Sequence, residues 1–319
     1  MKFSLPKIAT APFCPPEVSG SVPVDARAPF WKRVLRYAGP GLLISIGYMD
    51  PGNWATAIEA GSRYGYNLLF VVLLASLAGM AVQCLCSRLG IATGRDLAQL
   101  CRERYSQRSA RFQWVLAEIS IIATDLAEVL GCALAFHLLL GCSLTFGIAL
   151  TAFDTLLILA LQGKGFRRLE AIMLTLVMTI AACFLVELVL IKPYWPDVFE
   201  GFKPSLSAIS DAAPLYIAIG IVGATVMPHN LYLHTSIVQT RLTGTDYASK
   251  LDAVRLSRID TIGSLTLALL VNAAILILAA AAFHQTGHSE IIDIQDAYRM
   301  LDPLVGGALA SVLFGVALL

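Results

Sequence analysis

Charged residues are scarce in this sequence. Asp, Glu, Lys and Arg make up only 14% of its 319 residues, whereas about 25% is usual in a soluble domain. Hydrophobic residues make up 57% of the chain. This composition argues against an ordinary soluble enzyme or binding domain, and it indicates a protein that lies within a membrane.

Features of secreted and catalytic proteins are also missing. The seven cysteines include no pair in the predicted external connections, which argues against a disulfide framework. The connections contain no nucleotide-binding loop, no cluster of Cys and His and no nucleophile motif, so we expect no enzyme activity. Prolines interrupt every apolar run in the first 30 residues. This region therefore lacks the pattern of a cleavable signal peptide.

Apolar runs of about 20 residues, which can cross the hydrocarbon core of a bilayer as helices, occupy most of the remaining sequence. Seven runs are complete, and an eighth begins near residue 304 and still continues at Leu319. That ending predicts a piece of a longer protein, truncated in helix 8. We predict an all-α integral membrane protein with a flexible cytoplasmic N-terminal arm over residues 1–35 and a transmembrane domain over residues 36–319. The complete spans are predicted at about residues 39–64, 66–92, 113–139, 144–162, 169–191, 213–240 and 259–283.

Basic residues fall in alternate connections between these spans. Nineteen of the 23 lie in the N-terminal arm or in the connections after the second, fourth and sixth spans. The other side has only Arg63, Lys192, Lys203 and Arg299. Because cytoplasmic loops carry the excess of Lys and Arg, the N-terminus is predicted to be cytoplasmic.

Two of the predicted spans contain a proline in their middle. The first span reads Asp-Pro-Gly-Asn over residues 50–53, and the sixth reads Met-Pro-His-Asn over residues 227–230. Proline removes a backbone hydrogen bond and clashes with the preceding turn, so both helices are expected to break there. Five crossings separate the two breaks, which makes the spans run in opposite directions. Such a pair is expected of an inverted-repeat transporter, where the breaks form the substrate site, although two unrelated proline kinks are the simpler alternative.

The two breaks offer a mixed set of metal donors. Asp50 supplies a charge, Asn53 a neutral oxygen and Met227 a thioether, and the prolines free the carbonyls of Gly47 and Ala224. Hard ions such as Mg²⁺ and Ca²⁺ prefer an all-oxygen shell, whereas a soft thioether favours transition metals. We therefore expect a site for Mn²⁺, Fe²⁺ and similar ions that rejects Mg²⁺ and Ca²⁺.

The paired motifs resemble the signatures of the natural-resistance-associated macrophage protein (Nramp) family of proton-coupled manganese and iron transporters. The likeness extends to Gly-Pro-Gly-Leu-Leu before the first motif and to Asp-Leu-Ala-Glu over residues 125–128, and it covers the chain from about Arg36 onward. It implies a LeuT-like inverted-repeat bundle with discontinuous helices 1 and 6. It also implies metal ligands at Asp50, Asn53, Met227 and the Ala224 carbonyl. The family often has alanine at the position of Gly47, where a carbonyl contact would survive the exchange.

Proton carriers are expected among the ionisable residues inside the spans, which are costly to bury and are candidates for function. Asp125 and Glu128 are three residues apart and share a helix face. His229 lies in the second break and carries an imidazole, which titrates near neutrality. The alternative is that the acids only pair with arginine to hold helices together. The proton pathway that the resemblance implies comprises Asp50, His229, Glu128, Asp125, His234 and Arg241, with Arg241 as a charge partner.

The resulting prediction is import of Mn²⁺ and Fe²⁺ with protons by alternating access, with Cd²⁺, Co²⁺ and Zn²⁺ as further candidate ions. The partners are the lipid bilayer, the transported divalent metal ion and protons. We expect no permanently bound cofactor and no nucleic acid. The expected location is the plasma membrane, the inner membrane in a bacterium, crossed several times. A cation channel and a non-transporting membrane fragment are the alternatives.

Two of the other acidic residues in or beside the spans have an expected role. Glu59 follows the first break, where it is expected either to attract cations or to pair with Arg63 four residues on. Asp260 is expected to open the seventh span, because a carboxylate suits a helix N-terminus.

Overall fold

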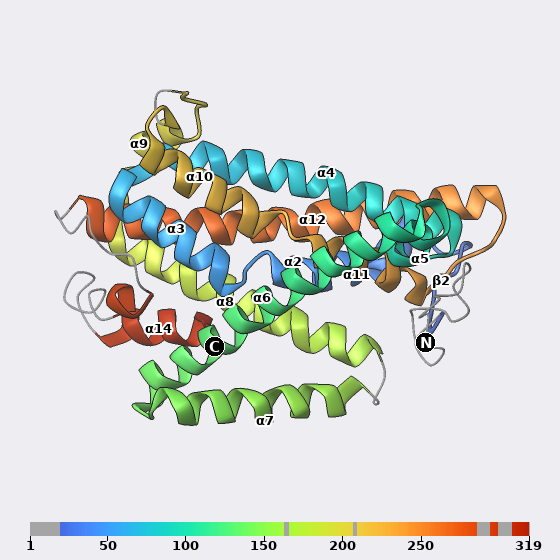
Figure 1. The fold of residues 1–319 in the computed structure, drawn as a ribbon, viewed down its shortest axis with the longest axis horizontal. Coiled ribbons are helices and arrows are strands. Elements are labelled where there is room, and N and C mark those ends of the chain that lie inside the picture. The colour runs from blue at the N-terminus through green and yellow to red at the C-terminus, as the bar shows by residue number, and fades with distance from the viewer. Residues whose placement is uncertain (1–19, 163–165, 207–208, 286–293, 299–307, 319) are drawn as a thin grey trace.

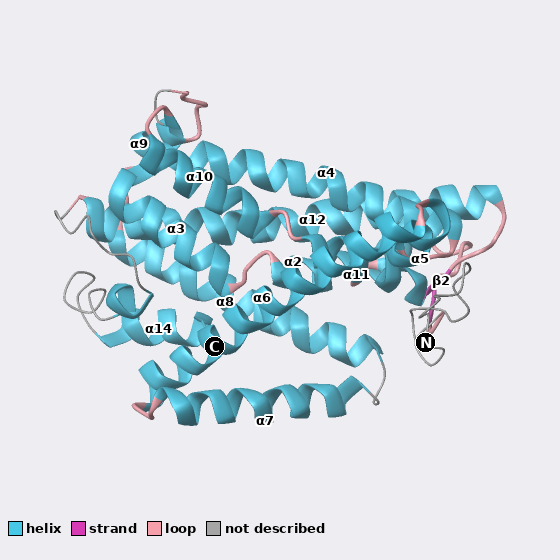
Figure 2. Cartoon of the chain, viewed as in Figure 1, coloured by secondary structure: helices cyan, strands magenta, loops and turns pink. Residues whose placement is uncertain are grey.

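A computed structural model describes residues 20–162, 166–206, 209–285, 294–298 and 308–318. The described chain is a bundle of helices whose long members run roughly along the longest axis of the molecule (Figures 1 and 2). The elements in chain order are β1 Val22–Pro23, α1 Phe30–Tyr37, α2 Pro40–Gly47, α3 Pro51–Tyr64, η1 Gly65–Leu68, α4 Leu69–Thr93, α5 Leu97–Arg104, α6 Gln107–Leu140, α7 Leu144–Gln162, α8 Phe166–Ile191, α9 Trp195–Gly201, α10 Ala212–Thr225, α11 Pro228–Ile237, η3 Val238–Thr240, β2 Arg241–Leu242, α12 Tyr247–Ala279, the π-helical turn η4 Ala280–His284 and α14 Ala308–Leu318.

Several of these helices are long and apolar enough to cross a membrane. Among the described residues there are five such stretches, and a shorter apolar helix covers Leu144–Leu156. The chain is therefore a multi-pass membrane protein. The five stretches are Pro51–Thr93, Gln107–Leu140, Arg167–Ile191, Ala212–Thr240 and Tyr247–His284.

The first of these stretches joins the second half of the first predicted span to the second span, because the two helices are separated only by a short 3₁₀ turn. Helix α3 ends at Tyr64, and the 3₁₀ turn η1 leads directly into α4. Gly65 makes the reversal with a φ of +59°, in the left-handed region that glycine enters without steric cost. Helix α14, within the predicted eighth span, begins at Ala308, and residues 304–307 lie outside the described residues.

Helix α12 forms the centre of the bundle. It contacts α2, α3, α4 and α8. Of its most apolar stretch of 18 residues, 78% is buried inside the bundle. Trp54 of α3 packs edge-on against Phe184 and Phe314, with ring centroids 5.0 and 5.2 Å apart respectively. In helix α6, by contrast, only 17% of the most apolar stretch of 18 residues is buried inside the bundle. Its outward apolar side chains suit contact with lipid, because chains of that kind gain nothing from facing water.

Helix α12 begins 12 residues before the predicted start of the seventh span at about residue 259, so the expected place of Asp260 is wrong. The helix starts at Tyr247, and its N-cap Asp246 accepts a hydrogen bond from the Ser249 backbone N–H at 3.1 Å. The bonds from Ser249 hold the pKa of the exposed Asp246 carboxyl below its usual range. Asp260 therefore lies inside α12.

The Asp260 carboxylate instead serves the start of α2. It accepts hydrogen bonds from the backbone N–H groups of Gly39, at 3.2 Å, and Gly41, at 2.7 Å. A carboxylate stabilises the positive N-terminal end of a helix, so the expected chemistry is present but acts on a different helix.

Part of the predicted N-terminal arm is packed against the bundle. Strand β1 pairs with β2 in parallel register, with Val22 opposite Arg241. Helix α1 contacts α12, and Arg33 forms an ion pair with Asp252. Residues 1–19 of the arm lie outside the described residues.

Candidate metal site

The first proline motif lies where one helix ends and the next begins. Helix α2 ends at Gly47 and α3 begins at Pro51. Proline suits the first position of a helix, where its missing N–H would have no partner in any case. Asp50 is the N-cap of α3, and its Oδ1 accepts a hydrogen bond from the Asn53 backbone N–H at 2.8 Å. The same proline deprives the Gly47 carbonyl of its helical donor.

Side chains of α12 and α3 donate hydrogen bonds to the carbonyls of this break. Asn272 of α12 donates its Nδ2 to the Tyr48 carbonyl at 2.7 Å. The Trp54 indole donates to the Met49 carbonyl at 3.1 Å. Unpaired carbonyls at bilayer depth are costly, so these two bonds stabilise the non-helical turn between α2 and α3.

The second motif also separates two helices. Helix α10 ends at Thr225 and α11 begins at Pro228, and Val226 and Met227 between them are not helical. Helix α10 contacts α3, and α11 contacts α2 (Figure 1). Because the chain runs from α2 to α3 in one case and from α10 to α11 in the other, the two broken pairs are antiparallel. Their non-helical turns lie near the middle of the bundle (Figure 2).

Asn53 joins the two breaks. Its Nδ2 donates to Asp50 Oδ1 at 2.8 Å and to the Ala224 carbonyl at 3.1 Å. Its Oδ1 lies 3.2 Å from the Thr225 hydroxyl, which also donates to the Ile221 carbonyl at 2.7 Å. An amide NH₂ thus bridges two of the oxygens predicted to bind a cation. For Asn53 to become a metal ligand its amide must turn, because only the oxygen can coordinate a cation.

Met227 and Gly47 meet at Asn230. Asn230 Nδ2 lies 3.5 Å from the Met227 sulfur, and both side chains are buried. A Cβ added to Gly47 would lie 2.3 Å from the same amide nitrogen. Alanine at position 47 would therefore require Asn230 to shift, a consequence that the carbonyl argument from sequence does not predict.

Replacing Thr225 by valine should strengthen Mn²⁺ binding by up to about fivefold, because it removes a contact, worth about 1 kcal/mol at most, that favours the metal-free orientation of the Asn53 amide. The matched control is Thr56→Val, since the Thr56 hydroxyl bonds only to carbonyls of its own helix, at 3.0 and 3.1 Å. Calorimetric titration with Mn²⁺ measures both variants. Equal affinity of Thr225→Val and the native protein would remove Thr225 from the site.

The acidic pair of α6 lies next to the first break. A Cβ on Gly131 would lie 2.3 Å from Pro51 Cγ, so α6 packs directly on that proline through a glycine. Glu128 is one turn earlier on α6 and lies within electrostatic range of Asp50 and Asp125. The structure therefore brings Glu128, one of the two predicted proton carriers of α6, toward the candidate metal site.

The two histidines of α11 have different surroundings. His229 is half-buried and lies within electrostatic range of Asp125. His234 is fully buried, and its Nδ1 lies 2.8 Å from Oε1 of Gln83 on α4. The negative charge of Asp125 on α6 therefore acts on His229, whereas His234 contacts the neutral amide of Gln83.

Arg241 forms a buried ion pair away from those acids. Its Nη2 lies 2.7 Å from Glu170 Oε1, with the two side chains 0% and 5% exposed. It also donates to the Tyr37 carbonyl at 2.7 Å and the Ala38 carbonyl at 2.9 Å. The described contacts of Arg241 therefore fix the segment between α1 and α2. Glu59 and Arg63 form the other expected pair, with a separation of 3.3 Å.

Within the described residues, no group of three or more His, Cys, Asp or Glu side chains could hold a metal ion. The donors at the breaks are instead one carboxylate, one amide, one thioether and backbone carbonyls. A shell with a single anionic side chain suits an ion that is bound and released.

Comparison with known proteins places the chain in a family. The model described as "Natural resistance-associated macrophage protein-like" matches residues 41–319. The chain belongs to the Nramp family. This assignment confirms the resemblance seen in the two proline motifs, and it makes the protein a relative of transporters and not of enzymes.

Two curated relatives are close in sequence to this Nramp chain. It is 72% identical over 319 residues to "Divalent metal cation transporter MntH 1" of Pseudomonas aeruginosa, covering all of this chain and 73% of that protein. It is 65% identical over 316 residues to "Divalent metal cation transporter MntH" of Ralstonia nicotianae, covering 99% and 72%.

A solved Nramp structure shares the fold. A point mutant of the Eremococcus coleocola manganese transporter superposes with a TM-score of 0.86 at 37% identity, covering 95% of this chain. The chain spans 65% of that transporter, just under two thirds of its length.

Proposed function

We propose that this Nramp chain imports divalent transition-metal ions, chiefly Mn²⁺ and Fe²⁺, together with protons by alternating access. The observation that supports this most directly is the convergence of the two helix breaks, where Asn53 bridges Asp50 and the Ala224 carbonyl. Met227 lies in the second break and adds a sulfur donor. The names of the curated relatives, which are divalent metal cation transporters, agree with this function.

The proposed architecture is a LeuT-like inverted repeat. In it, α2 and α3 form discontinuous helix 1, and α10 and α11 form discontinuous helix 6. The antiparallel contacts of α3 with α10 and of α2 with α11 support this arrangement. Tilting of the two broken helices would close the site on one side and open it on the other.

The proposed ligands are Asp50, Asn53, Met227 and the carbonyls of Gly47 and Ala224. The thioether selects transition metals, among which we include Cd²⁺, Co²⁺ and Zn²⁺, over Mg²⁺ and Ca²⁺. On metal entry the Asn53 amide turns, and its oxygen replaces the NH₂ group between Asp50 and Ala224. The bond from Thr225 to the amide oxygen must then break or follow the turn.

Replacing Met227 by alanine should keep part of the Mn²⁺ transport while allowing Ca²⁺ or Mg²⁺ to compete, because an oxygen-only shell suits hard ions. The measurement is Mn²⁺ uptake into proteoliposomes in the presence of excess Ca²⁺ or Mg²⁺. Met178→Ala is the control, since Met178 is exposed on α8. Unchanged selectivity in Met227→Ala would mean that the sulfur does not touch the ion.

The proposed proton pathway starts at Asp50 and continues through His229, Glu128 and Asp125. The packing of α6 on the first break supports transfer between Asp50 and Glu128. His234 and Arg241 follow along the same segment, toward the end of the bundle that carries most basic residues. Because its guanidinium is paired with Glu170, Arg241 acts in this pathway as a fixed positive charge.

We place the protein in the plasma membrane, the inner membrane in a bacterium, with a cytoplasmic N-terminus. The alternation of basic connections supports this orientation. A potential that is negative inside then favours cation entry by about 2.3 kcal/mol per charge per 100 mV.

Proteoliposomes that report internal Mn²⁺ and internal pH test the proposal. Transport coupled to protons predicts acidification of the lumen only when Mn²⁺ is added outside. Liposomes without protein and protein without metal serve as controls. Mn²⁺ flux without proton movement would instead favour the cation channel.

A further inference from the structure

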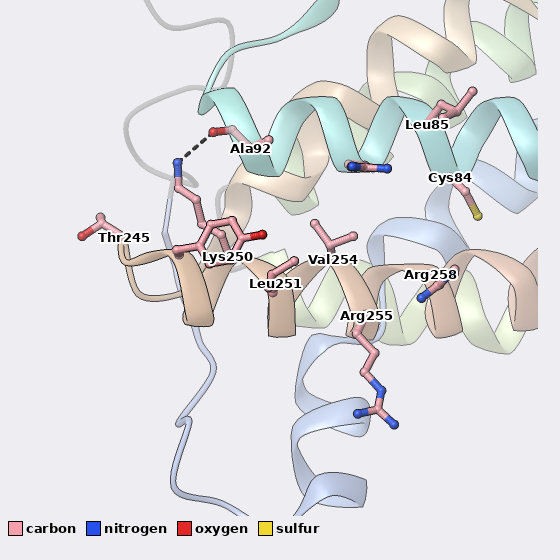
Figure 3. Close-up of a pocket in the computed structure, with 11 residues that line it drawn as sticks. Cys84, Leu85, Ala92, Thr245, Lys250, Leu251, Val254, Arg255 and Arg258 are labelled. Atoms are coloured by element: carbon pink, nitrogen blue, oxygen red, sulfur yellow. Dashed lines mark hydrogen bonds between the residues drawn. The ribbon is translucent and has the colours of Figure 1, made fainter.

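A cavity lies between α4 and α12, far along the bundle from the proline motifs. Its volume is about 920 Å³. Four of its eleven lining residues are basic, and no Asp or Glu is among the lining residues that the structure describes. Figure 3 shows the labelled side chains between the two helices. The basic residues are Arg88, Lys250, Arg255 and Arg258.

Three of these cations are available to a ligand. Arg88 and Arg258 take part in none of the ion pairs among the described residues, and both are exposed. Lys250 donates to the Ala92 carbonyl at 2.8 Å, which leaves two of its three ammonium hydrogens. Arg255 differs, because its guanidinium lies 5.3 Å from the centre of the Phe30 ring and points away from α4 (Figure 3).

An anion with several oxygens would stabilise this arrangement. Like charges held at one cavity repel each other, and an anionic group between them converts repulsion into charge-assisted hydrogen bonds. A phosphate group offers enough acceptor oxygens for two guanidinium groups and one ammonium group. The chemistry of the cavity therefore indicates a phosphate.

The apolar neighbours of these cations indicate that the phosphate is carried by a lipid. Leu85 and Leu251 line the same cavity with 63% and 52% of their surfaces exposed. Arg258 lies eleven residues after Tyr247, about 16 Å along α12, and the helix becomes apolar soon after it. The cations thus surround the boundary between the polar and apolar parts of the helix, where phospholipid headgroups lie. A soluble phosphate has no acyl chain that could pack against the exposed leucines.

We infer that the cavity between α4 and α12 binds the phosphate of an anionic phospholipid through Arg88, Lys250 and Arg258, with acyl chains against the exposed leucines. The inference rests on the membrane embedding and goes beyond metal transport. Basic pockets between membrane helices at the cytoplasmic side have the right chemistry for such headgroups.

Native mass spectrometry of the purified, delipidated protein tests this inference. The probes are dioleoylphosphatidylglycerol, dioleoylphosphatidylcholine with the same chains, and inorganic phosphate. We expect phosphatidylglycerol to bind at least about tenfold more tightly than phosphatidylcholine. Equal binding of the two lipids would overturn the inference. Displacement of phosphatidylglycerol by millimolar inorganic phosphate would overturn the lipid source and assign the cavity to a soluble anion.

Variants separate this cavity from general attraction to positive charge. The double variant Arg88→Gln with Arg258→Gln should lose about tenfold in phosphatidylglycerol affinity. Arg108→Gln, which removes an exposed charge from α6 outside the cavity, should change it less than twofold. Equal losses in both variants would contradict the inference.

A charge-conserving variant guards against misfolding. Arg88→Lys with Arg258→Lys should retain phosphatidylglycerol affinity within about threefold, because lysine also binds phosphate as a point charge. A tenfold loss in this variant would contradict binding through charge at these positions. The assay contains no metal, so its failure would leave the proposed transport function untouched.

Discussion

Replacing Asp50 by alanine should lower Mn²⁺ uptake into proteoliposomes by on the order of 100-fold or more. Asp50 is the only anionic side chain among the proposed ligands, and its Oδ1 accepts both Asn53 hydrogen bonds. Removing one partner of a buried charged pair costs about 3–5 kcal/mol, and each 1.4 kcal/mol corresponds to a factor of ten in affinity. Initial rates of uptake at low Mn²⁺ concentration measure the effect.

The matched control for this loss is Asp154→Ala. Asp154 also lies in an apolar helix, α7, but outside both breaks, so its removal should leave uptake within about twofold of native. Calorimetry on Asp50→Ala should show the same loss in Mn²⁺ binding. Near-native uptake by Asp50→Ala would exclude its carboxylate from the mechanism.

Replacing Arg241 by alanine should destabilise the protein by about 3–5 kcal/mol, because the substitution removes the fully buried cation of Glu170. The carboxylate then keeps only Arg167, whose side chain is 46% exposed. The substitution also removes the Arg241 bonds to the Tyr37 and Ala38 carbonyls, which precede α2, although the Ala38 carbonyl keeps a bond from Arg167. Thermal unfolding in detergent, followed by the fraction of protein that remains monodisperse, measures the loss. Transport should fall as well, since the position of α2 depends on this segment.

An exposed ion pair provides the control for Arg241. Lys203 and Glu200 are 70% and 69% exposed, and a surface pair contributes only about 0–1 kcal/mol. Lys203→Ala should therefore leave the unfolding temperature nearly unchanged. The double variant Arg241→Ala with Glu170→Ala should recover part of the lost stability. No recovery in the double variant would mean that the buried Glu170 charge is not the cause.

The helix breaks could be predicted from sequence because proline acts on its own backbone. Pro51 and Pro228 are the first residues of α3 and α11, and no distant contact is needed to explain why α2 and α10 end before them. The donors next to each proline follow directly from the motif. Local chemistry thus supplied the candidate ligands Asp50, Asn53 and Met227.

The partners of these residues could not be predicted, because they come from distant parts of the chain. Asn53 meets Thr225 from 172 positions away, and Asn272 reaches Tyr48 across 224 positions. Gln83 and Glu170 are polar residues within predicted membrane spans, which is the one signal the sequence offered. That signal marks a buried polar contact but does not say with which residue.

Asp260 shows how a correct chemical rule can be applied to the wrong element. The rule that a carboxylate stabilises a helix N-terminus holds, but the polar segment from Tyr247 to Arg258 continues α12 and leaves Asp260 in its interior. The carboxylate then reaches Gly39 and Gly41 at the start of α2. The hydrophobic pattern of the sequence indicates the apolar part of α12 but not the charged turns with which the helix begins.

Diffraction from crystals of the protein grown with Mn²⁺, collected to record the anomalous signal of manganese, tests the central claim most directly. We expect one strong peak within coordination distance of the Asp50 carboxylate and the Met227 sulfur, with the Asn53 amide turned so that its oxygen faces the ion. A peak elsewhere in the bundle, or none between the two proline turns at saturating Mn²⁺, would contradict it.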